Sequence, residues 1–313
     1  MRCLVTGAAG FLGSHLLARL LENGDTVTAL LRPTSNPWRI QQLLPQVEVI
    51  HCDLADTANI GERLKAARPE VVYHLAWVGG SSGRHQNDLT QIEDNLPASV
   101  ALLRKAAEAG ARRWIGCGSA AEYGLVDGPV SEAAVPHPHT LYGITKYALC
   151  LMTAKMCALL GLEYLWARPF AVYGPQDNPR GLIAFATQTL LRGERPSLTA
   201  GEQLWDYLFV EDAARALVRL ASAPVDGIFN IASGEADSLR SLVERIRDLI
   251  DPALPLGFGE IAYPPDQLMR LQADVSKLRR LANWAPQVSL NEGLRRVITE
   301  YAGQMPPASG RPR

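Results

Sequence analysis

The sequence has almost no excess of charge and no paired cysteine motif. Its 313 residues include 31 Lys and Arg against 32 Asp and Glu, for a formal net charge of −1. This balance gives no reason to expect a nucleic acid as a partner. The five cysteines are odd in number and scattered, with no CxxC pair, so neither a disulfide framework nor a metal site is indicated. Reduced thiols in a cytoplasmic protein are the simplest interpretation.

Long hydrophobic runs are also missing. No stretch of the sequence is expected to span a bilayer. The first expected strand begins within two residues of Met1, which leaves no room for a signal peptide. We therefore expect no membrane partner. The length suits one large α/β unit or two domains, with ample residues for a sizeable core.

Short apolar runs alternate with helical patterns over the first half of the chain. Runs that are apolar on both faces are typical of buried parallel strands. Repeated strand–helix units predict a doubly wound parallel sheet. The expected strands are 3–6, 26–30, 47–51, 71–75, 114–117 and 164–167, and the expected helices are 11–23, 57–67, 86–109 and 141–160.

This rhythm breaks after Arg168, where Pro and Gly become dense. The fold class predicted is α/β, a Rossmann-type doubly wound parallel sheet with a smaller C-terminal substrate-binding lobe. Further elements are expected as helices at 181–192, from near 210, at 239–250 and at 290–301, and as a strand at 228–231. The expected domains are a dinucleotide-binding domain at 1–168 with 205–232 returning to it, a lobe at 169–204 and 233–303, and a tail at 304–313. The tail is expected to be disordered from residue 306.

Three glycines, Gly7, Gly10 and Gly13, lie between the first expected strand and helix. In such a turn, backbone N–H groups and the helix dipole point at the gap and favour an anion. Glycine permits the turn and lets a phosphate approach the backbone. The spacing is GxxGxxG rather than GxGxxG, and the alternative is a tight turn without a ligand. The pattern predicts a dinucleotide cofactor.

The residues at the end of the second expected strand indicate whether the cofactor is NAD or NADP. NAD-specific sites usually place an acid there to hold the ribose hydroxyls. Leu31 stands at that position and Arg32 follows it, so a guanidinium is available for a 2′-phosphate. Ser35 offers a hydroxyl, and Asp53 is a candidate for the adenine edge. We expect NADP, with NAD as the other option and a solvated Arg32 as the alternative interpretation.

Tyr142 and Lys146 are four residues apart, so a helix places both on one face. The ammonium is expected to lower the tyrosine pKa from about 10 by favouring the phenolate. Such a tyrosine can give or take a proton at a carbonyl or alcohol oxygen. A YxxxK pair alone is weak evidence, but Ser119 ends a strand upstream and can bond the same oxygen. The alternative role for Ser119 is a helix or turn cap.

Read together, these motifs resemble the extended short-chain dehydrogenase/reductase family, and its nucleotide-sugar branch in particular. The motifs that carry the resemblance, in family order, are TGAAGFLG (6–13), CDL (52–54), HLAW (74–77), DNLPAS (94–99), GSAAEYG (118–124), YGITK (142–146), RPFAVYGP (168–175), DYLFVEDAARAL (206–217) and ADVSKLRRLANWAP (273–286).

The resemblance implies roles for individual residues. Ser119, Tyr142 and Lys146 are the implied catalytic residues, and Asn95 matches a position that supports the proton relay. The implied reaction is hydride transfer at a sugar carbon, as reduction, epimerisation or the first step of dehydration. The implied cofactor contacts are Gly7, Gly10, Phe11, Leu12, Gly13, Arg32, Asp53, Leu54, Leu75, Ala76 and Lys146, and the implied substrate contacts are Trp77, Ala120, Tyr123, Arg180 and Arg270.

The sequence departs from the family at positions that matter for the substrate. Sugar 4,6-dehydratases carry an Asp-Glu pair just after the catalytic Ser or Thr, where this chain has Ala120 and Ala121, so elimination lacks its acid and base. Two usual diphosphate contacts are replaced by Ala171 and Trp205. Arg180 is a candidate to compensate, as is Arg192, although both can equally be solvated surface charges.

The leading hypothesis is NADPH-dependent reduction of a nucleotide-activated 4-keto-6-deoxy sugar. The alternatives are an NAD-dependent nucleotide-sugar epimerase, a reductase of a non-nucleotide carbonyl, and a non-catalytic NADP sensor. Family members pair the helices that match 86–109 and 141–160 across a two-fold axis, so the resemblance also implies a homodimer.

Overall fold

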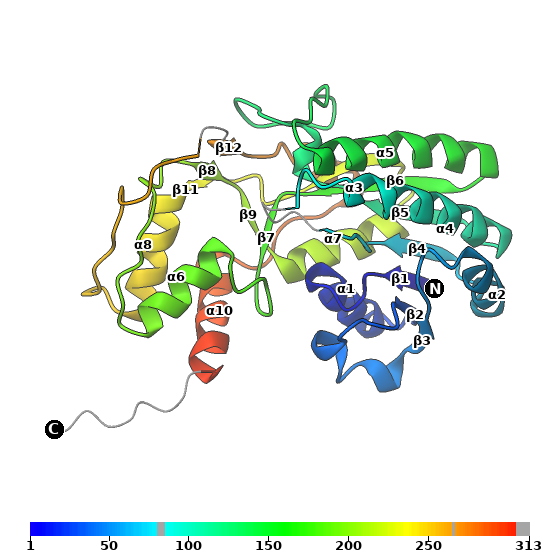
Figure 1. Cartoon of the computed structure of the whole chain (residues 1–313), viewed down its shortest axis with the longest axis horizontal. Coiled ribbons are helices and arrows are strands. Elements are labelled where there is room, and N and C mark those ends of the chain that lie inside the picture. Colours follow the sequence, from blue (N-terminus) through cyan, green and yellow to red (C-terminus); the bar gives the residue numbers. More distant parts are fainter. Residues whose placement is uncertain (80–84, 265–266, 305–313) are drawn as a thin grey trace.

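The computed structural model describes residues 1–79, 85–264 and 267–304; the disordered tail expected at 306–313 lies outside them. Its main sheet has seven strands, all parallel, and β1 lies between β2 and β4 (Figure 1). The chain therefore winds outward in two directions from β1, which leaves a crevice at the carboxyl ends of β1 and β4. In spatial order the strands are β10 (Gly227–Ile231), β6 (Glu163–Pro169), β5 (Arg113–Cys117), β4 (Val71–His74), β1 (Arg2–Thr6), β2 (Thr26–Leu31) and β3 (Glu48–His51).

Helices cover both faces of this sheet. Alternate side chains of a strand point to opposite faces, so Cys3 and Val5 pack with α1 and α7, whereas Leu4 packs with α2 and α4. Both core layers are buried, and this is why the strands are apolar throughout. One face carries α1 (Phe11–Glu22) and α7 (Val210–Ser222), and the other carries α2 (Thr57–Ala67), α4 (Leu96–Glu108) and α5 (Leu141–Leu160).

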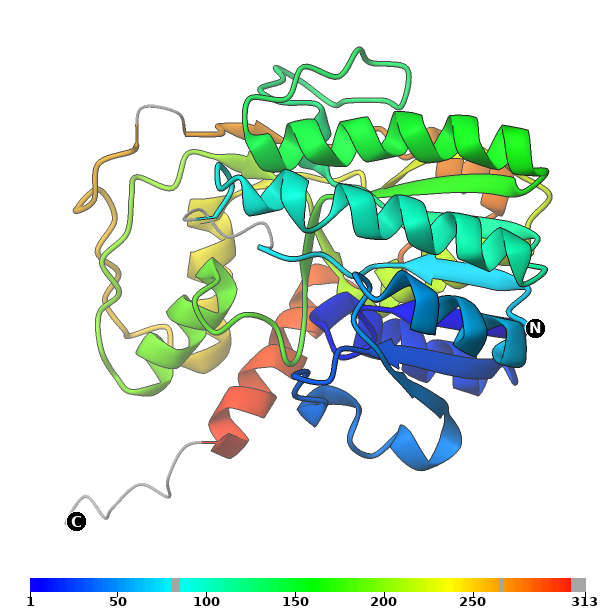
Figure 2. The same cartoon turned by 45° about the vertical axis from the view of Figure 1, so that its right-hand side comes forward.

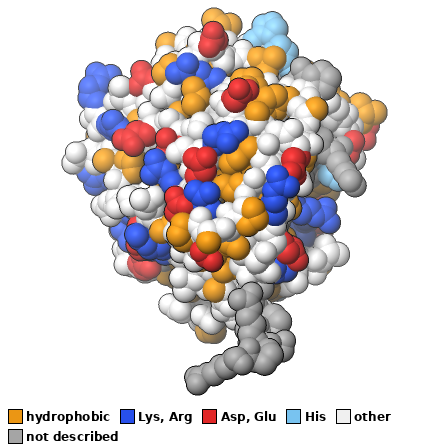
Figure 3. Space-filling model, turned by 90° about the vertical axis from the view of Figure 1, so that its left-hand side faces the viewer, with side chains coloured by type: hydrophobic (Ala, Val, Ile, Leu, Met, Phe, Trp, Pro, Cys, Tyr) orange, Lys and Arg blue, Asp and Glu red, His pale blue; other side chains and the backbone are white. Residues whose placement is uncertain are grey.

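A smaller unit, called the lobe here, lies beside the carboxyl edge of the sheet (Figures 1 and 2). Three of its helices share one hydrophobic core: α6 (Leu182–Leu191), α8 (Leu239–Ile250) and α10 (Leu290–Gln304). Its strands are β7 (Ala171–Tyr173) paired with β9 (Tyr207–Phe209), and β8 (Leu204–Trp205) between β11 (Asp237–Ser238) and β12 (Arg270–Leu271). Positive, negative and hydrophobic side chains mix over its outer face (Figure 3), in keeping with the balanced composition.

The structure differs from the sequence-based expectation in three ways. The helix expected at 86–109 is two helices, α3 (Thr90–Glu93) and α4, because Pro97 lacks the N–H that a continuous helix needs and is tolerated only in a first turn. The short lobe strands were not expected, since two or three residues carry no periodic pattern. Helix α9 (Ser276–Ala282) was also missed, and it packs back against β10.

Helix α5 also corrects an expectation. Among the described residues it is the one helix long and apolar enough to cross a bilayer, with 20 residues and a mean hydropathy of 1.3. A single helix of this kind is weak evidence for a membrane span, because core helices pass the same test. One side of α5 buries Tyr142, Lys146 and Leu149 against the rest of the fold, while Leu151 and Leu159 are exposed on the other.

Candidate functional site

The glycine turn after β1 packs closely against the segment after β4 and against the start of α1. Gly7 has φ +72°, and a Cβ there would lie 2.7 Å from the Ala76 nitrogen. A Cβ at Gly13 would overlap the Gly7 carbonyl. Helix α1 begins at Phe11 with no side-chain cap, so its first N–H groups remain open to an anion. The turn therefore fits the dinucleotide phosphates that the sequence predicts.

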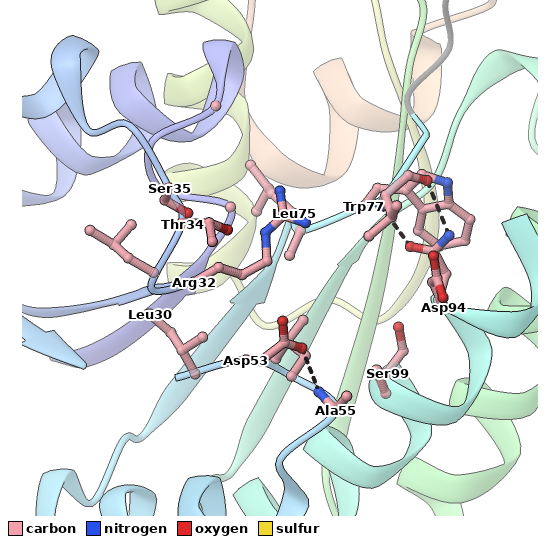
Figure 4. A pocket seen from close by; sticks show the side chains of 18 of the residues that line it. Leu30, Arg32, Thr34, Ser35, Asp53, Ala55, Leu75, Trp77, Asp94 and Ser99 are labelled. Carbon is pink, nitrogen blue, oxygen red and sulfur yellow. Dashed lines mark hydrogen bonds between the residues drawn. The ribbon is translucent and has the colours of Figure 1, made fainter. Parts of the chain in front are cut away.

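A cavity of about 790 Å³ opens beside this turn (Figure 4), within the size range of cofactor sites. Seven predicted cofactor contacts line it: Gly7, Gly10, Arg32, Asp53, Leu54, Leu75 and Ala76. Phe11, Leu12, Gly13 and Lys146 are not on its lining. Trp77, expected at the substrate, lies on this cavity instead. Sequence reasoning missed other lining residues, among them Thr34, Asn36, Val78, Asp94 and Ser99.

The end of β2 keeps the character expected of an NADP site. Leu31 is buried at 3% exposure and offers no carboxylate, whereas the exposed Arg32 reaches over the cavity (Figure 4). Asp53 accepts a hydrogen bond from the Ala55 backbone N–H at 2.9 Å, which fixes its carboxylate at the cavity wall. The end of β2 thus carries a guanidinium and no carboxylate, as the sequence indicates.

Polar side chains also organise the floor of the cavity. The Asn95 side chain accepts from the Val78 N–H at 2.8 Å and donates to the Gln91 carbonyl at 3.0 Å, so it holds the segment after β4. Below it, His74 Nδ1 lies 2.8 Å from the Thr6 hydroxyl and His74 Nε2 lies 2.8 Å from the Ser99 hydroxyl. Burial, with a smaller effect of the Lys146 charge, lowers the pKa of His74 to about 3, so this imidazole is neutral.

Helix α5 brings Tyr142 and Lys146 together with Ser119, which lies two residues after the end of β5. The helix starts where the Thr140 hydroxyl accepts from the Gly143 N–H at 3.1 Å. The Ser119 side chain lowers the pKa of the Tyr142 hydroxyl, so the two side chains act on each other. The Lys146 ammonium donates to the Cys117 carbonyl at 2.6 Å and lies 3.7 Å from the centre of the Trp77 ring. Trp77 in turn meets Tyr142 edge-on, with ring centres 6.1 Å apart.

Burial governs the titration of this set. It raises the pKa of Tyr142 well above its usual range, and the Ser119 hydrogen bond opposes that rise only in part. Burial lowers the pKa of Lys146 to about 8, while Cys117 and Glu122 act in the opposite direction. The expectation that Lys146 lowers the tyrosine pKa is therefore wrong for the chain by itself, because desolvation of the phenolate is the larger effect. At neutral pH, Tyr142 is a phenol.

A second cavity, the cleft, has a volume of about 770 Å³ and lies between the sheet and the lobe. Ser119 and Ala120 form part of its wall, and so do Ala171 and Trp205, which replace the family's usual diphosphate contacts. Arg180 is the one Lys or Arg among the described residues of that wall. Most of the remaining wall is apolar, for example Phe170, Ile183, Phe185, Leu198, Phe258 and Leu271.

Two expected substrate contacts lie away from the cleft wall. Tyr123 is 2% exposed, and its hydroxyl donates to the Asn230 side-chain oxygen at 2.7 Å. Arg270 donates to the Gln272 side-chain oxygen at 3.0 Å, and the neighbouring Leu271 faces the cleft in its place. Adjacent residues of a strand point to opposite sides, so β12 presents only one of the two to the cleft.

Comparison with known proteins adds a family and relatives. The NAD dependent epimerase/dehydratase family matches residues 3–232. The chain is 31% identical over 313 residues to UDP-glucose 4-epimerase of Mycolicibacterium smegmatis, covering 95% of this chain and 97% of the relative. It is 25% identical to GDP-6-deoxy-D-mannose reductase of Pseudomonas aeruginosa, over 97% and 98%.

Solved structures of nucleotide-sugar epimerases are also similar to this chain. UDP-glucuronic acid 4-epimerase from Bacillus cereus, in complex with UDP-glucuronic acid and NAD, superposes with a TM-score of 0.86 at 26% identity, covering 97% of this chain and 100% of that one. Among these relatives, 4-epimerases are better represented than reductases. The comparison therefore favours the epimerase alternative over the ketoreductase that the sequence places first, and it confirms a nicotinamide dinucleotide family without deciding between NAD and NADP.

Proposed function

This chain belongs to the NAD dependent epimerase/dehydratase family, and from that premise we propose that it interconverts the C4 epimers of a nucleotide-activated sugar. The observation that carries the proposal is the position of the Ser119, Tyr142 and Lys146 set. Ser119 forms part of the cleft wall, while Trp77, which stacks on Lys146 and meets Tyr142, forms part of the cofactor cavity. A sugar bound in the cleft can thus place the carbon that carries its reacting hydroxyl next to a nicotinamide bound in the cofactor cavity, with Ser119, Tyr142 and Lys146 beside both.

The side chains have distinct tasks in this proposal. A bound nicotinamide dinucleotide supplies and accepts the hydride. Tyr142 moves the proton at the sugar oxygen, and the Ser119 hydroxyl bonds the same oxygen and holds it in line. Lys146 keeps its charge beside the cofactor cavity, where it favours a phenolate whenever Tyr142 gives up its proton. The mostly apolar walls of the cleft exclude water, which strengthens each of these contacts.

For the substrate we propose a nucleoside diphosphate sugar held through Arg180. The diphosphate carries negative charge, and Arg180 is the single cation on the described cleft wall. An arginine can bond phosphate oxygens in a bidentate manner. It stands just before α6, whose start at Leu182 also lacks a side-chain cap and also forms part of the wall.

A second candidate is NADPH-dependent reduction of a nucleotide-activated 4-keto-6-deoxy sugar. One observation favours it, namely the Leu31 and Arg32 pair at the end of β2, since a reductase must exchange its cofactor at every turnover and NADPH is the usual reductant. The similarity to GDP-6-deoxy-D-mannose reductase supports the same candidate. Both candidates use Ser119, Tyr142 and Lys146 in the same roles.

One experiment separates the two. The purified protein is incubated with NADPH or NAD and with UDP-glucose, UDP-glucuronic acid or a 4-keto sugar nucleotide, and the products are separated by chromatography while NAD(P)H absorbance is followed. An epimerase forms the C4 epimer with no net change in absorbance. Stoichiometric NADPH consumption with the keto sugar, and no epimer, would assign the reductase. Failure of every sugar nucleotide would contradict both.

We also propose that two copies of the chain associate through α5. Ile144, Leu151, Met152 and Leu159 expose apolar surface on the side of α5 that faces away from the sheet, at 41% to 72% exposure. A two-fold arrangement would bury this surface in both copies at once. Light scattering at micromolar concentration tests it, and a monomer mass would contradict the proposal.

A further inference from the structure

A buried ion pair lies behind Ser119 and takes no part in the proposed chemistry. The Glu122 and Arg168 side chains are 0% and 1% exposed, and their charged groups are 2.8 Å apart. Taking two charges out of water costs free energy that their attraction does not always repay. The Glu122–Arg168 pair therefore needs a task that a pair of apolar side chains could not perform.

The Glu122 carboxylate joins three N–H groups from two parts of the fold, the turn after β5 and strand β6. Oε1 accepts from the Ser119 backbone N–H at 2.8 Å and from the Trp166 indole N–H at 2.9 Å, and Oε2 accepts from Arg168 Nε at 2.8 Å. An ionised carboxylate has two acceptor oxygens and no donor, whereas a glutamine has one acceptor oxygen and an NH₂ group that would face other donors. The three donors together therefore specify a carboxylate.

The neighbouring sequence makes room for this contact. In the sheet, Gly116 of β5 lies opposite Trp166 of β6, and a Cβ at Gly116 would overlap the indole ring. A Cβ at Gly118 would overlap both the Glu122 carboxylate and the Trp166 nitrogen. The two glycines that precede Ser119 are thus needed for Trp166 and Glu122 to reach each other. The segments GCGS (116–119) and WAR (166–168), which are far apart in the sequence, therefore pack together around the Glu122 carboxylate.

Arg168 extends the same structure toward β10. Its guanidinium stacks on the Tyr123 ring at 4.4 Å, and the Tyr123 hydroxyl donates to Asn230. Ser119 itself begins a 3-10 turn over Ala120–Glu122, in which its hydroxyl accepts from the Ala121 N–H at 3.1 Å. Glu122 at the end of that turn bonds back to the Ser119 backbone, as in a capping box.

We propose that Glu122 is a positioning residue for Ser119, and that Trp166 and Arg168 hold the Glu122 carboxylate for this task. The role in turnover rests on the proposed oxidoreductase function, whereas the effect on Ser119 and its neighbours does not. Glu122 fixes the backbone of Ser119 from the interior, and this holds Ser119 in place on the cleft wall. Its carboxylate also adds negative charge near Lys146, whose other ionisable neighbours are Cys117, His74 and Tyr142.

Three single variants separate the effect of the Glu122 side-chain length, the effect of its charge and the effect of a general loss of stability. Glu122→Asp keeps the charge but is one methylene too short to reach all three donors. Glu122→Gln keeps the length but removes the charge and leaves Arg168 unpaired. Asp212→Asn is the matched control, because Asp212 is equally buried, pairs with Arg215 and accepts from the Gln287 and Val288 N–H groups away from both cavities.

Two measurements on the protein without cofactor come first. Amide hydrogen exchange reports how firmly Ser119 is held, and ¹³C NMR of the lysine side chains reports the pKa of Lys146. We expect Glu122→Asp to speed exchange at Ser119 by at least about tenfold, while Asp212→Asn does not. We expect Glu122→Gln to move the Lys146 pKa below about 8 by at least half a unit, on the order of the effect of a nearby charge.

Turnover gives the third readout if the proposed function holds. Glu122→Asp should lower kcat by about 10- to 100-fold, the scale for a misplaced catalytic group, and leave the Kd of the cofactor within about twofold. Wild-type exchange at Ser119 in Glu122→Asp, or a Lys146 pKa that moves no more in Glu122→Gln than in Asp212→Asn, would overturn the proposal. A wild-type protein that turns over no sugar nucleotide would refute the function and leave these two tests to decide the role of Glu122.

Discussion

The cofactor cavity and the cleft lie side by side but are built in different ways. The cofactor cavity stands at the carboxyl ends of parallel strands, and its residues come in short runs after β1, β2, β3 and β4 and from residues 93–99, where α3 ends and α4 begins. The cleft wall combines segments from β6 onward with loops, two-residue strands and α6. The difference shows that regular secondary structure determines where a motif points, whereas irregular segments depend on contacts made far along the chain.

The largest effect is expected where the two cavities meet. Tyr142→Phe removes the hydroxyl that we propose moves the proton, so turnover should fall by at least about 10²-fold. Binding of the cofactor should persist, because Tyr142 is not on the lining of that cavity. Stopped-flow kinetics and a fluorescence titration of the cofactor measure the two separately.

Tyr123→Phe is the control for this variant, since that hydroxyl only bonds Asn230 inside the fold. It should cost some stability and leave turnover near the wild-type rate. If Tyr142→Phe turned over as fast as Tyr123→Phe, the assigned proton transfer would be wrong.

The next effect tests the cofactor cavity alone. Arg32→Ala should weaken NADPH binding by roughly 1.5–3 kcal/mol, the loss expected for a charge-assisted phosphate contact. The affinity for NADH should hardly change, because Leu31 and Arg32 offer nothing specific to a ribose hydroxyl. Titrations of both dinucleotides into both proteins measure this. Equal affinities for NADH and NADPH in the wild-type protein would contradict the preference for NADP.

The contrast between the cavities also explains what the sequence could predict. The sheet, the glycine turn and the Tyr142–Lys146 pair follow from periodicity and helical spacing, and seven predicted cofactor contacts lie on one cavity. Arg270 and Tyr123 were expected at the substrate, but their orientation depends on β12 and on Asn230, which no local pattern encodes. The pKa of Tyr142 was misjudged because burial cannot be read from the spacing of two residues. Ser99 belongs to the DNLPAS motif (94–99), but nothing in that motif indicated that its hydroxyl would lie against His74.

A smaller effect is expected in the cleft. Arg180→Gln should raise the KM for a sugar nucleotide by about 5- to 10-fold, because one exposed charge-assisted contact to the diphosphate is lost, and should leave kcat and the cofactor Kd unchanged. Arg192→Gln is the matched control, since Arg192 follows α6, pairs with Glu194 at 2.9 Å and is not on the cleft wall. If both variants behaved alike, Arg180 would not be the diphosphate contact, and a non-nucleotide carbonyl substrate would become the stronger alternative.

The smallest effect concerns Asp177, an acid on the cleft wall. Burial raises the pKa of this carboxyl to about 6, against the opposing hydrogen bond from the Asn178 N–H and the charge of Arg39. The folded chain therefore holds this proton more tightly than the unfolded chain, whose Asp titrates near 3.9. Stability due to this group is lost as the pH rises from about 4 to about 6 and remains lost above. Asp177→Asn can keep the hydrogen bond but never ionises, so it should be more stable than wild type by on the order of 1 kcal/mol at pH 7.5, with a smaller gain near pH 5. Urea unfolding at the two pH values measures this, and a gain that is the same at both would show that the charge of Asp177 is not the cause.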